Sequence, residues 1–147
     1  MAERDGRLLG LDLGERRIGV ALSDPTAFLA SAYGVLPSQG RARDVAAVAQ
    51  IVAREDVGAV VVGVPVNMDG SYGPQAEKSH RFGAALAQSG VAVVYWDERL
   101  TTVEADRTLI GAGMHRKKRR EVVDKIAATL LLQSYLDANA RPQAEGP

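Results

Sequence analysis

The stretch RLLGLDLGERRIGVALS, residues 7–23, decides the fold that we expect for this chain. Apolar and small residues dominate its two halves, 7–13 and 17–23, so each half predicts a strand. The short Gly-Glu-Arg segment between the halves predicts a hairpin turn. The two strands should therefore pair antiparallel and begin a sheet.

The rest of the chain extends this hairpin into an α/β fold. Apolar runs predict three more strands, at 28–36, 59–65 and 91–96. Helical spacing predicts helices at 41–55, 74–89 and 101–110, and a basic loop then leads into a long last helix at 121–138. This order predicts a mixed five-stranded sheet, an antiparallel meander followed by parallel strands, with helices on both faces.

Composition favours one cytoplasmic domain. The 147 residues are 46% hydrophobic, which suits a single domain over 1–147, with frayed ends at about 1–6 and 140–147. There is no cysteine for disulfides or thiolate metal sites, no apolar run near the roughly 20 residues that span a membrane, and no signal-peptide pattern. The 18 basic and 18 acidic residues balance, so any phosphate-binding surface has to be local.

Three acids stand where solvated carboxylates are unexpected. Asp12 lies inside an apolar strand, on the side opposite Leu9, Leu11 and Leu13, and the small residues on its own side would leave open space beside it. It needs a partner there, such as Arg16, Arg17 or a bound cation. Glu98 and its neighbour Asp97 follow the strand 91–96 at the edge where α/β sheets gather ligand sites, although either acid could serve as a local cap or ion pair.

The third acid, Asp124, aligns with Ala127, Ala128 and Leu131 on the apolar stripe of the last helix. A favourable helix dipole would explain an acid in the first turn, but it would not explain this alignment. Clustered carboxylates repel one another unless a cation lies among them. Oxygen ligands without cysteine favour Mg²⁺ or Mn²⁺, so Asp12, Glu98 and Asp124 are the predicted metal ligands and catalytic residues.

Four blocks of the chain resemble a known nuclease family: GLDLGERRIGVALSDP (10–25), VVVGVPVNMDGSYGPQA (60–76), WDERLTTVEA (96–105) and VDKIAATLLLQSYLD (123–137). They are similar to the YqgF-type family of RNase H-like nucleases, also described as Holliday junction resolvases of the RuvX type. The resemblance implies an RNase H-like fold and metal-binding carboxylates at Asp12, Glu98 and Asp124. It also implies action in 5′-end maturation of pre-16S ribosomal RNA, with cleavage of branched DNA as the alternative.

The expected substrate is structured RNA, with ribosomal precursor particles as further partners of a monomer or homodimer. The candidate substrate-binding residues combine family motif positions with the uninterrupted basic run 116–120: Arg17, Asn67, Arg99, Thr101, Thr102, Arg116, Lys117, Lys118, Arg119 and Arg120. Two other hypotheses stay open on the residues alone. The GLDLG hairpin is also typical of the ATP-binding loop of the actin and sugar-kinase group, but those proteins need two such domains, and the length of this chain argues against that class. A nuclease-like fold can also bind ribosomal RNA without cutting it.

Overall fold

The computed structural model describes residues 6–100 and 116–140, and in the second range it describes side chains from residue 122 onward. One sheet of five strands forms its centre. The strands are β1 (Arg7–Leu13), β2 (Arg17–Ser23), β3 (Ala30–Pro37), β4 (Val57–Val64) and β5 (Val93–Asp97). The predicted hairpin is confirmed with the expected bounds.

The sheet is mixed, as the order of elements predicts. The strands lie in the order β3-β2-β1-β4-β5. β2 pairs antiparallel with both β1 and β3, whereas β4 pairs parallel with both β1 and β5. The carboxyl ends of the three parallel strands therefore meet at one edge, and Asp12 and Asp97 stand at that edge.

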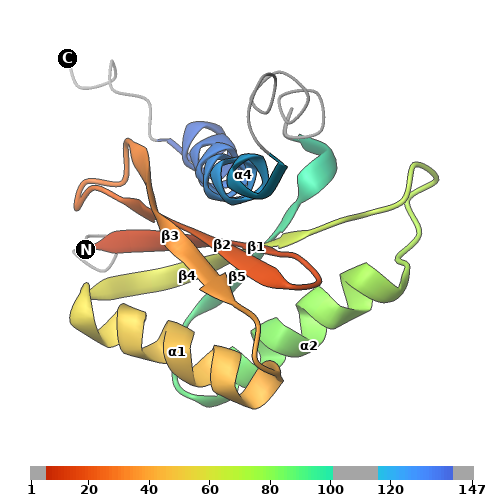
Figure 1. Cartoon of the computed structure of the whole chain (residues 1–147). Coiled ribbons are helices and arrows are strands. Elements are labelled where there is room, and N and C mark those ends of the chain that lie inside the picture. The colour runs from red at the N-terminus through yellow and green to blue at the C-terminus, as the bar shows by residue number, and fades with distance from the viewer. Residues whose placement is uncertain (1–5, 101–115, 141–147) are drawn as a thin grey trace.

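Helices cover both faces of the sheet (Figure 1). Helices α1 (Arg41–Arg54) and α2 (Pro74–Gln88) lie on one face, and α4 (Arg116–Ala138) lies on the other. Each layer has its own core, because a strand sends alternate side chains to opposite faces. The larger cluster, which includes Leu9, Val48 and Leu86, lies under α1 and α2, whereas the smaller one joins Val61 to Leu132 under α4.

The last helix begins earlier than the sequence suggests. The run 116–120 was expected to be a loop, but its backbone is the first part of α4. Arginine and lysine are good helix formers, and no glycine or proline separates the run from the apolar stripe. The expected helix at 101–110 and the expected frayed ends, except Gly6 and Ala140, lie outside the described residues. No helix in the described part of the chain is long and apolar enough to cross a membrane.

Candidate active site

Asp12 lies near the end of β1, on the face of the sheet that α4 covers. The alternate leucines of this strand are buried in the core under α1 and α2: Leu9, Leu11 and Leu13. Gly10 and Asp12 therefore point toward α4. A Cβ added at Gly10 would lie 2.7 Å from the Cβ of Leu132, so the helix packs directly on this face. The sidedness of β1 is as the sequence predicts.

Asp124 lies on α4 above the strand partner of Asp12. Asp12 stands opposite Gly19 in the β1–β2 pair. A Cβ added at Gly19 would overlap the carbonyl oxygen of Asp124 and would lie 3.3 Å from the Cβ of the buried Ala128. Only a glycine allows the helix backbone to come this close. The small residues beside Asp12 were expected to leave open space. That expectation is wrong, because α4 fills the space.

Glu98 lies on the same face of the sheet as Asp12, but it follows the edge strand β5. It is the first residue of the 3-10 turn η2 (Glu98–Leu100), which directly follows β5. A Cβ added at Gly63 in β4 would lie 2.8 Å from Glu98 Oε2 and 2.5 Å from Cδ1 of Leu131 on α4. Since Leu11 pairs with Val62 in the parallel β1–β4 ladder, Asp12 is next in register to Gly63. The Glu98 carboxylate thus lies one strand away from Asp12, under α4.

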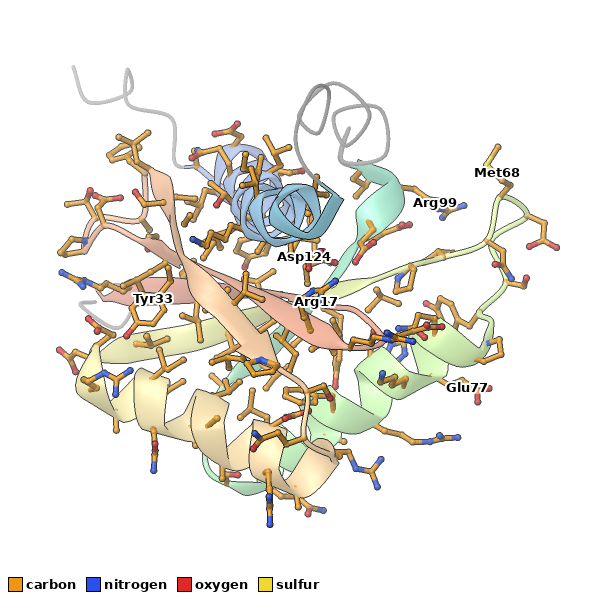
Figure 2. The ribbon with its side chains drawn as sticks, in the orientation of Figure 1. Arg17, Tyr33, Met68, Glu77, Arg99 and Asp124 are labelled. Carbon is orange, nitrogen blue, oxygen red and sulfur yellow. The ribbon has the colours of Figure 1, made fainter. Side chains whose placement is uncertain are left out.

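Arg17 connects the start of β2 to the candidate site. Its Nε donates a hydrogen bond of 2.9 Å to Oδ2 of Asp124, and both side chains are about a quarter exposed. Figure 2 shows Arg17 and Asp124 pointing toward one another between the sheet and α4. The sequence offered Arg17 as a phosphate contact or as a structural partner of Asp12. In this structure the guanidinium orients the Asp124 carboxylate.

The three predicted ligands gather on one face, but they do not form a finished metal site in this conformation. Among the side chains that the structure describes, no group of three or more histidine, aspartate and glutamate residues could hold a metal ion. The donor set nevertheless fits a hard cation, since Asp12, Glu98 and Asp124 offer only carboxylate oxygens. The glycines beside them allow close approach of the elements that carry them. The side chains would have to turn toward one another around a cation.

Asp97 serves a different purpose from Glu98. Its carboxylate accepts hydrogen bonds from the Arg99 guanidinium, the shortest 2.8 Å from Nη2, and another of 2.8 Å from the Arg99 backbone N–H. The Arg99 side chain holds the pKa of Asp97 below its ordinary value, and the pKa of Arg99 is raised in return. Nη1 of Arg99 also donates to the carbonyl oxygen of Asn67 at 3.3 Å. This ion pair therefore ties the loop after β4 to the end of β5.

The remaining predicted binding residues are placed only in part. Asn67 lies in the loop after β4, where its side-chain amide donates to the Ser71 hydroxyl at 3.0 Å. The backbone of the basic run 116–120 begins α4, the helix that carries Asp124, but its side chains lie outside the described part of the chain. Thr101 and Thr102 also lie outside the described residues.

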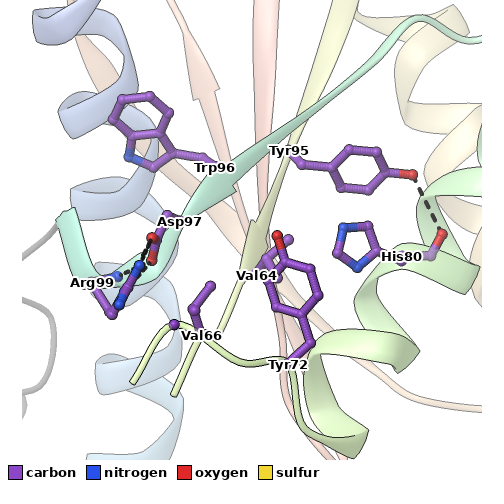
Figure 3. A pocket seen from close by; sticks show the side chains of 9 residues that line it. Val64, Val66, Tyr72, His80, Tyr95, Trp96, Asp97 and Arg99 are labelled. Atoms are coloured by element: carbon purple, nitrogen blue, oxygen red, sulfur yellow. Dashed lines mark hydrogen bonds and ion pairs between the residues drawn. The ribbon is translucent and has the colours of Figure 1, made fainter. Parts of the chain in front are cut away.

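A pocket of about 220 Å³ beside Asp97 is formed largely by residues that the sequence did not single out. Three aromatic rings from a loop, from α2 and from β5 lie together in its lining: Tyr72, His80 and Tyr95 (Figure 3). No sequence motif marks this cluster, because Tyr72, His80 and Tyr95 come from separate elements and stand at no regular spacing in the sequence. The only hint is the alternation of Tyr95 with Trp96 in β5, which sends the two rings to opposite faces of the sheet.

Comparison with known proteins places this chain in a family. The model of the family described as RuvX, Holliday junction resolvase, matches residues 6–138. A relative from Pelotomaculum thermopropionicum is 46% identical over 141 residues, which are 95% of this chain and 92% of the relative. A relative from Myxococcus xanthus is 47% identical over 140 residues, which are 95% and 93% of the two chains. Both relatives carry the provisional name of pre-16S rRNA nuclease.

Solved structures share the fold at low sequence identity. RuvC from T. thermophilus, in complex with a Holliday junction, matches with a TM-score of 0.58 and 16% identity over 92% of this chain and 97% of that one. The fowlpox virus Holliday junction resolvase matches with a TM-score of 0.52 and 14% identity over 90% and 98% of the two chains. At these identities the similarity concerns the fold alone, and it confirms the expected RNase H-like architecture.

Proposed function

The chain belongs to the RuvX family, and from this premise we propose that it is a metal-dependent nuclease that acts in 5′-end processing of pre-16S ribosomal RNA. It hydrolyses phosphodiester bonds, as the nuclease names of its relatives indicate. The finer assignment of a ribosomal precursor rests on those names. Such a substrate would be met in the cytoplasm, on precursor particles of the ribosome.

The observation that carries the proposal is the pair of close contacts at Gly19 and Gly63. Through the first, Asp124 lies against the strand partner of Asp12. Through the second, the Glu98 carboxylate lies beside the end of β1. Three acids that are far apart in the sequence thus share one face at one sheet edge. This is the expected setting for carboxylates that bind cations and a phosphodiester.

Each residue of the site has a distinct role in this proposal. Asp12, Glu98 and Asp124 are the residues that would hold Mg²⁺ or Mn²⁺. A divalent ion in such a site polarises the attacking water and neutralises charge on the leaving oxygen. Arg17 holds Asp124 in position through the ion pair. The basic residues 116–120, at the start of the same helix, would bind the phosphate backbone on either side of the cut.

The test compares cleavage by the wild type and by Asp12→Asn in Mn²⁺, with an RNA that carries the 5′ leader of 16S ribosomal RNA. Glu77→Gln is the matched control, because it removes one negative charge from an exposed carboxylate on α2. Wild type and control should cut, and Asp12→Asn should not. Calorimetry should show weaker Mn²⁺ binding to Asp12→Asn alone. Equal cleavage by all three proteins would refute the metal-site assignment.

A four-way DNA junction is the second substrate to test. The observation that favours it is the fold shared with resolvases, since the matching T. thermophilus RuvC structure contains a Holliday junction. Faster Mn²⁺-dependent cleavage of the junction than of the RNA would make branched DNA the substrate. Tight binding of RNA by wild type and Asp12→Asn, without products from either, would instead make the protein a non-catalytic ribosomal RNA-binding factor.

A further inference from the structure

Three aromatic rings meet in the pocket beside Asp97. The ring of His80 lies between the other two, with centroid distances of 5.3 Å to Tyr72 and 4.7 Å to Tyr95. Val64, Val66 and Arg99 also line this pocket (Figure 3). At about 220 Å³ the pocket is smaller than the usual site for a drug-sized ligand, but it can hold one small planar group.

Packing within the protein explains these aromatic side chains only in part. Tyr95 packs on Gly83 in α2 and its hydroxyl donates to the carbonyl oxygen of His80 at 3.3 Å. Tyr72 contacts the ring of His80, but 59% of it stays exposed at the rim of the pocket. Met68, 96% exposed, and Leu100, 60% exposed, lie in the two segments that border the same edge. Exposed apolar side chains thus follow the carboxyl ends of two strands, β4 and β5, that border the candidate active site.

The polar groups of the pocket suit a heterocyclic base. The Arg99 guanidinium is held by Asp97 and by the carbonyl oxygen of Asn67, so its plane is fixed and its charge is balanced. Guanidinium planes and aromatic rings are the surfaces on which proteins stack unpaired bases. Nδ1 of His80 lies 3.0 Å from the carbonyl oxygen of Ala76, which can only accept, so Nδ1 carries the proton. In the tautomer with its proton on Nδ1, Nε2 is an acceptor for an amino group of a base.

We infer that this pocket binds one unpaired nucleobase of the substrate, next to the phosphate that is cut. The identity of the ligand rests on the proposed nuclease function, and the binding site rests on the pocket. Asp97 and Arg99 line the pocket and flank Glu98 in the sequence, so a base held here places its own phosphate close to the candidate ligands. A base inside a duplex is covered on both faces and cannot enter. The enzyme therefore selects nucleic acid with a single-stranded or looped nucleotide at the cut.

Binding without metal tests the inference separately from catalysis. Fluorescence anisotropy of a labelled RNA, rather than the fluorescence of Trp96, reports binding, because the ring of Trp96 packs on Tyr135 of α4, on the face of β5 opposite Tyr95. A short single-stranded RNA and the blunt duplex of the same sequence are titrated in EDTA into wild type, Tyr72→Ala and Tyr72→Phe. Phe28→Ala is the matched control, because Phe28 is also exposed but lies in the turn between β2 and β3, not in the pocket lining.

Loss of the Tyr72 ring should weaken binding of the single strand about fivefold or more, since stacking on one ring contributes that much per base. Tyr72→Phe and Phe28→Ala should bind like the wild type, and affinity for the duplex should not change. Wild-type affinity of Tyr72→Ala for the single strand would overturn the inference, and so would an equal loss for both nucleic acids. A protein that fails to cut any substrate but shows the expected differences would refute the proposed nuclease function and leave the base site standing.

Discussion

Replacing Gly19 with alanine should separate α4 from the sheet and impair both the fold and the cleavage. The new methyl group would overlap the carbonyl oxygen of Asp124 and would stand 3.0 Å from its carbonyl carbon. Both atoms belong to the helix backbone, so no side chain can rotate out of the way. Overpacking of this kind costs about 1–3 kcal/mol of unfolding free energy. A shift of Asp124 by roughly 1 Å should lower the cleavage rate about 100-fold.

Gly34→Ala is the matched control for this substitution. Gly34 lies in β3 of the same sheet, and a Cβ there would meet no atom within 4 Å. Its unfolding free energy should stay within about 0.5 kcal/mol of the wild type or rise slightly. Urea unfolding followed by Trp96 fluorescence gives the stabilities, and single-turnover cleavage in Mn²⁺ gives the rates. A Gly19→Ala protein with wild-type stability and wild-type cleavage would refute the packing of Asp124 on β2.

Three further predictions concern charged groups. Arg17→Gln should lower the cleavage rate, because Asp124 loses the partner that orients it. It should lower the free energy of unfolding by less than about 1 kcal/mol, because both side chains of the pair are about a quarter exposed. Equal single-turnover rates for the wild type and Arg17→Gln would contradict this. Asp24→Ala should cost about 1–2 kcal/mol at neutral pH in urea unfolding, because the Asp24 carboxylate accepts hydrogen bonds from the backbone N–H of Leu29 and from Thr26, which hold its pKa well below the ordinary 3.8. Since the pKa is lowered by folding, this stabilisation is present above pH 3.8 and is lost as the pH falls further, so wild type and variant should converge in acid. Replacing residues 117–120 with alanine should reduce the salt dependence of RNA binding by about 0.7 in the log–log slope for each phosphate that the variant no longer neutralises, and an unchanged slope would show that the run does not touch the backbone.

Local patterns predicted most of the elements of the fold. Alternation and β-branched content marked the five strands to within about two residues at most ends, and Pro74 opens α2 as its fixed backbone angle favours. The sidedness of β1 and the burial of Ala127, Ala128 and Leu131 also followed from periodicity. The start of α4 did not, because a basic run suits both an exposed loop and the first turns of a helix.

The candidate site was predicted one residue at a time, but only tertiary structure joined its members. The sequence could state that Asp12, Glu98 and Asp124 were acids in unusual surroundings, because the cost of burying a charge depends on nearby residues. It offered Asp97 for a local ion pair, which Asp97 makes with Arg99, but it could not state that Arg17 pairs with Asp124, which lies 107 residues away. A pair between such distant residues depends on register and on how closely two elements pack.

Local sequence patterns define the order of strands and helices along the chain, the sides of the strands and the acids that stand in unusual surroundings. These properties depend on residues within a few positions of one another. Three contacts could be found only in the folded protein: α4 lies on Gly19, Glu98 lies over Gly63, and Tyr72, His80 and Tyr95 form one pocket. These contacts depend on the volumes of side chains from separate elements, which interact only after the sheet and its helices have packed together.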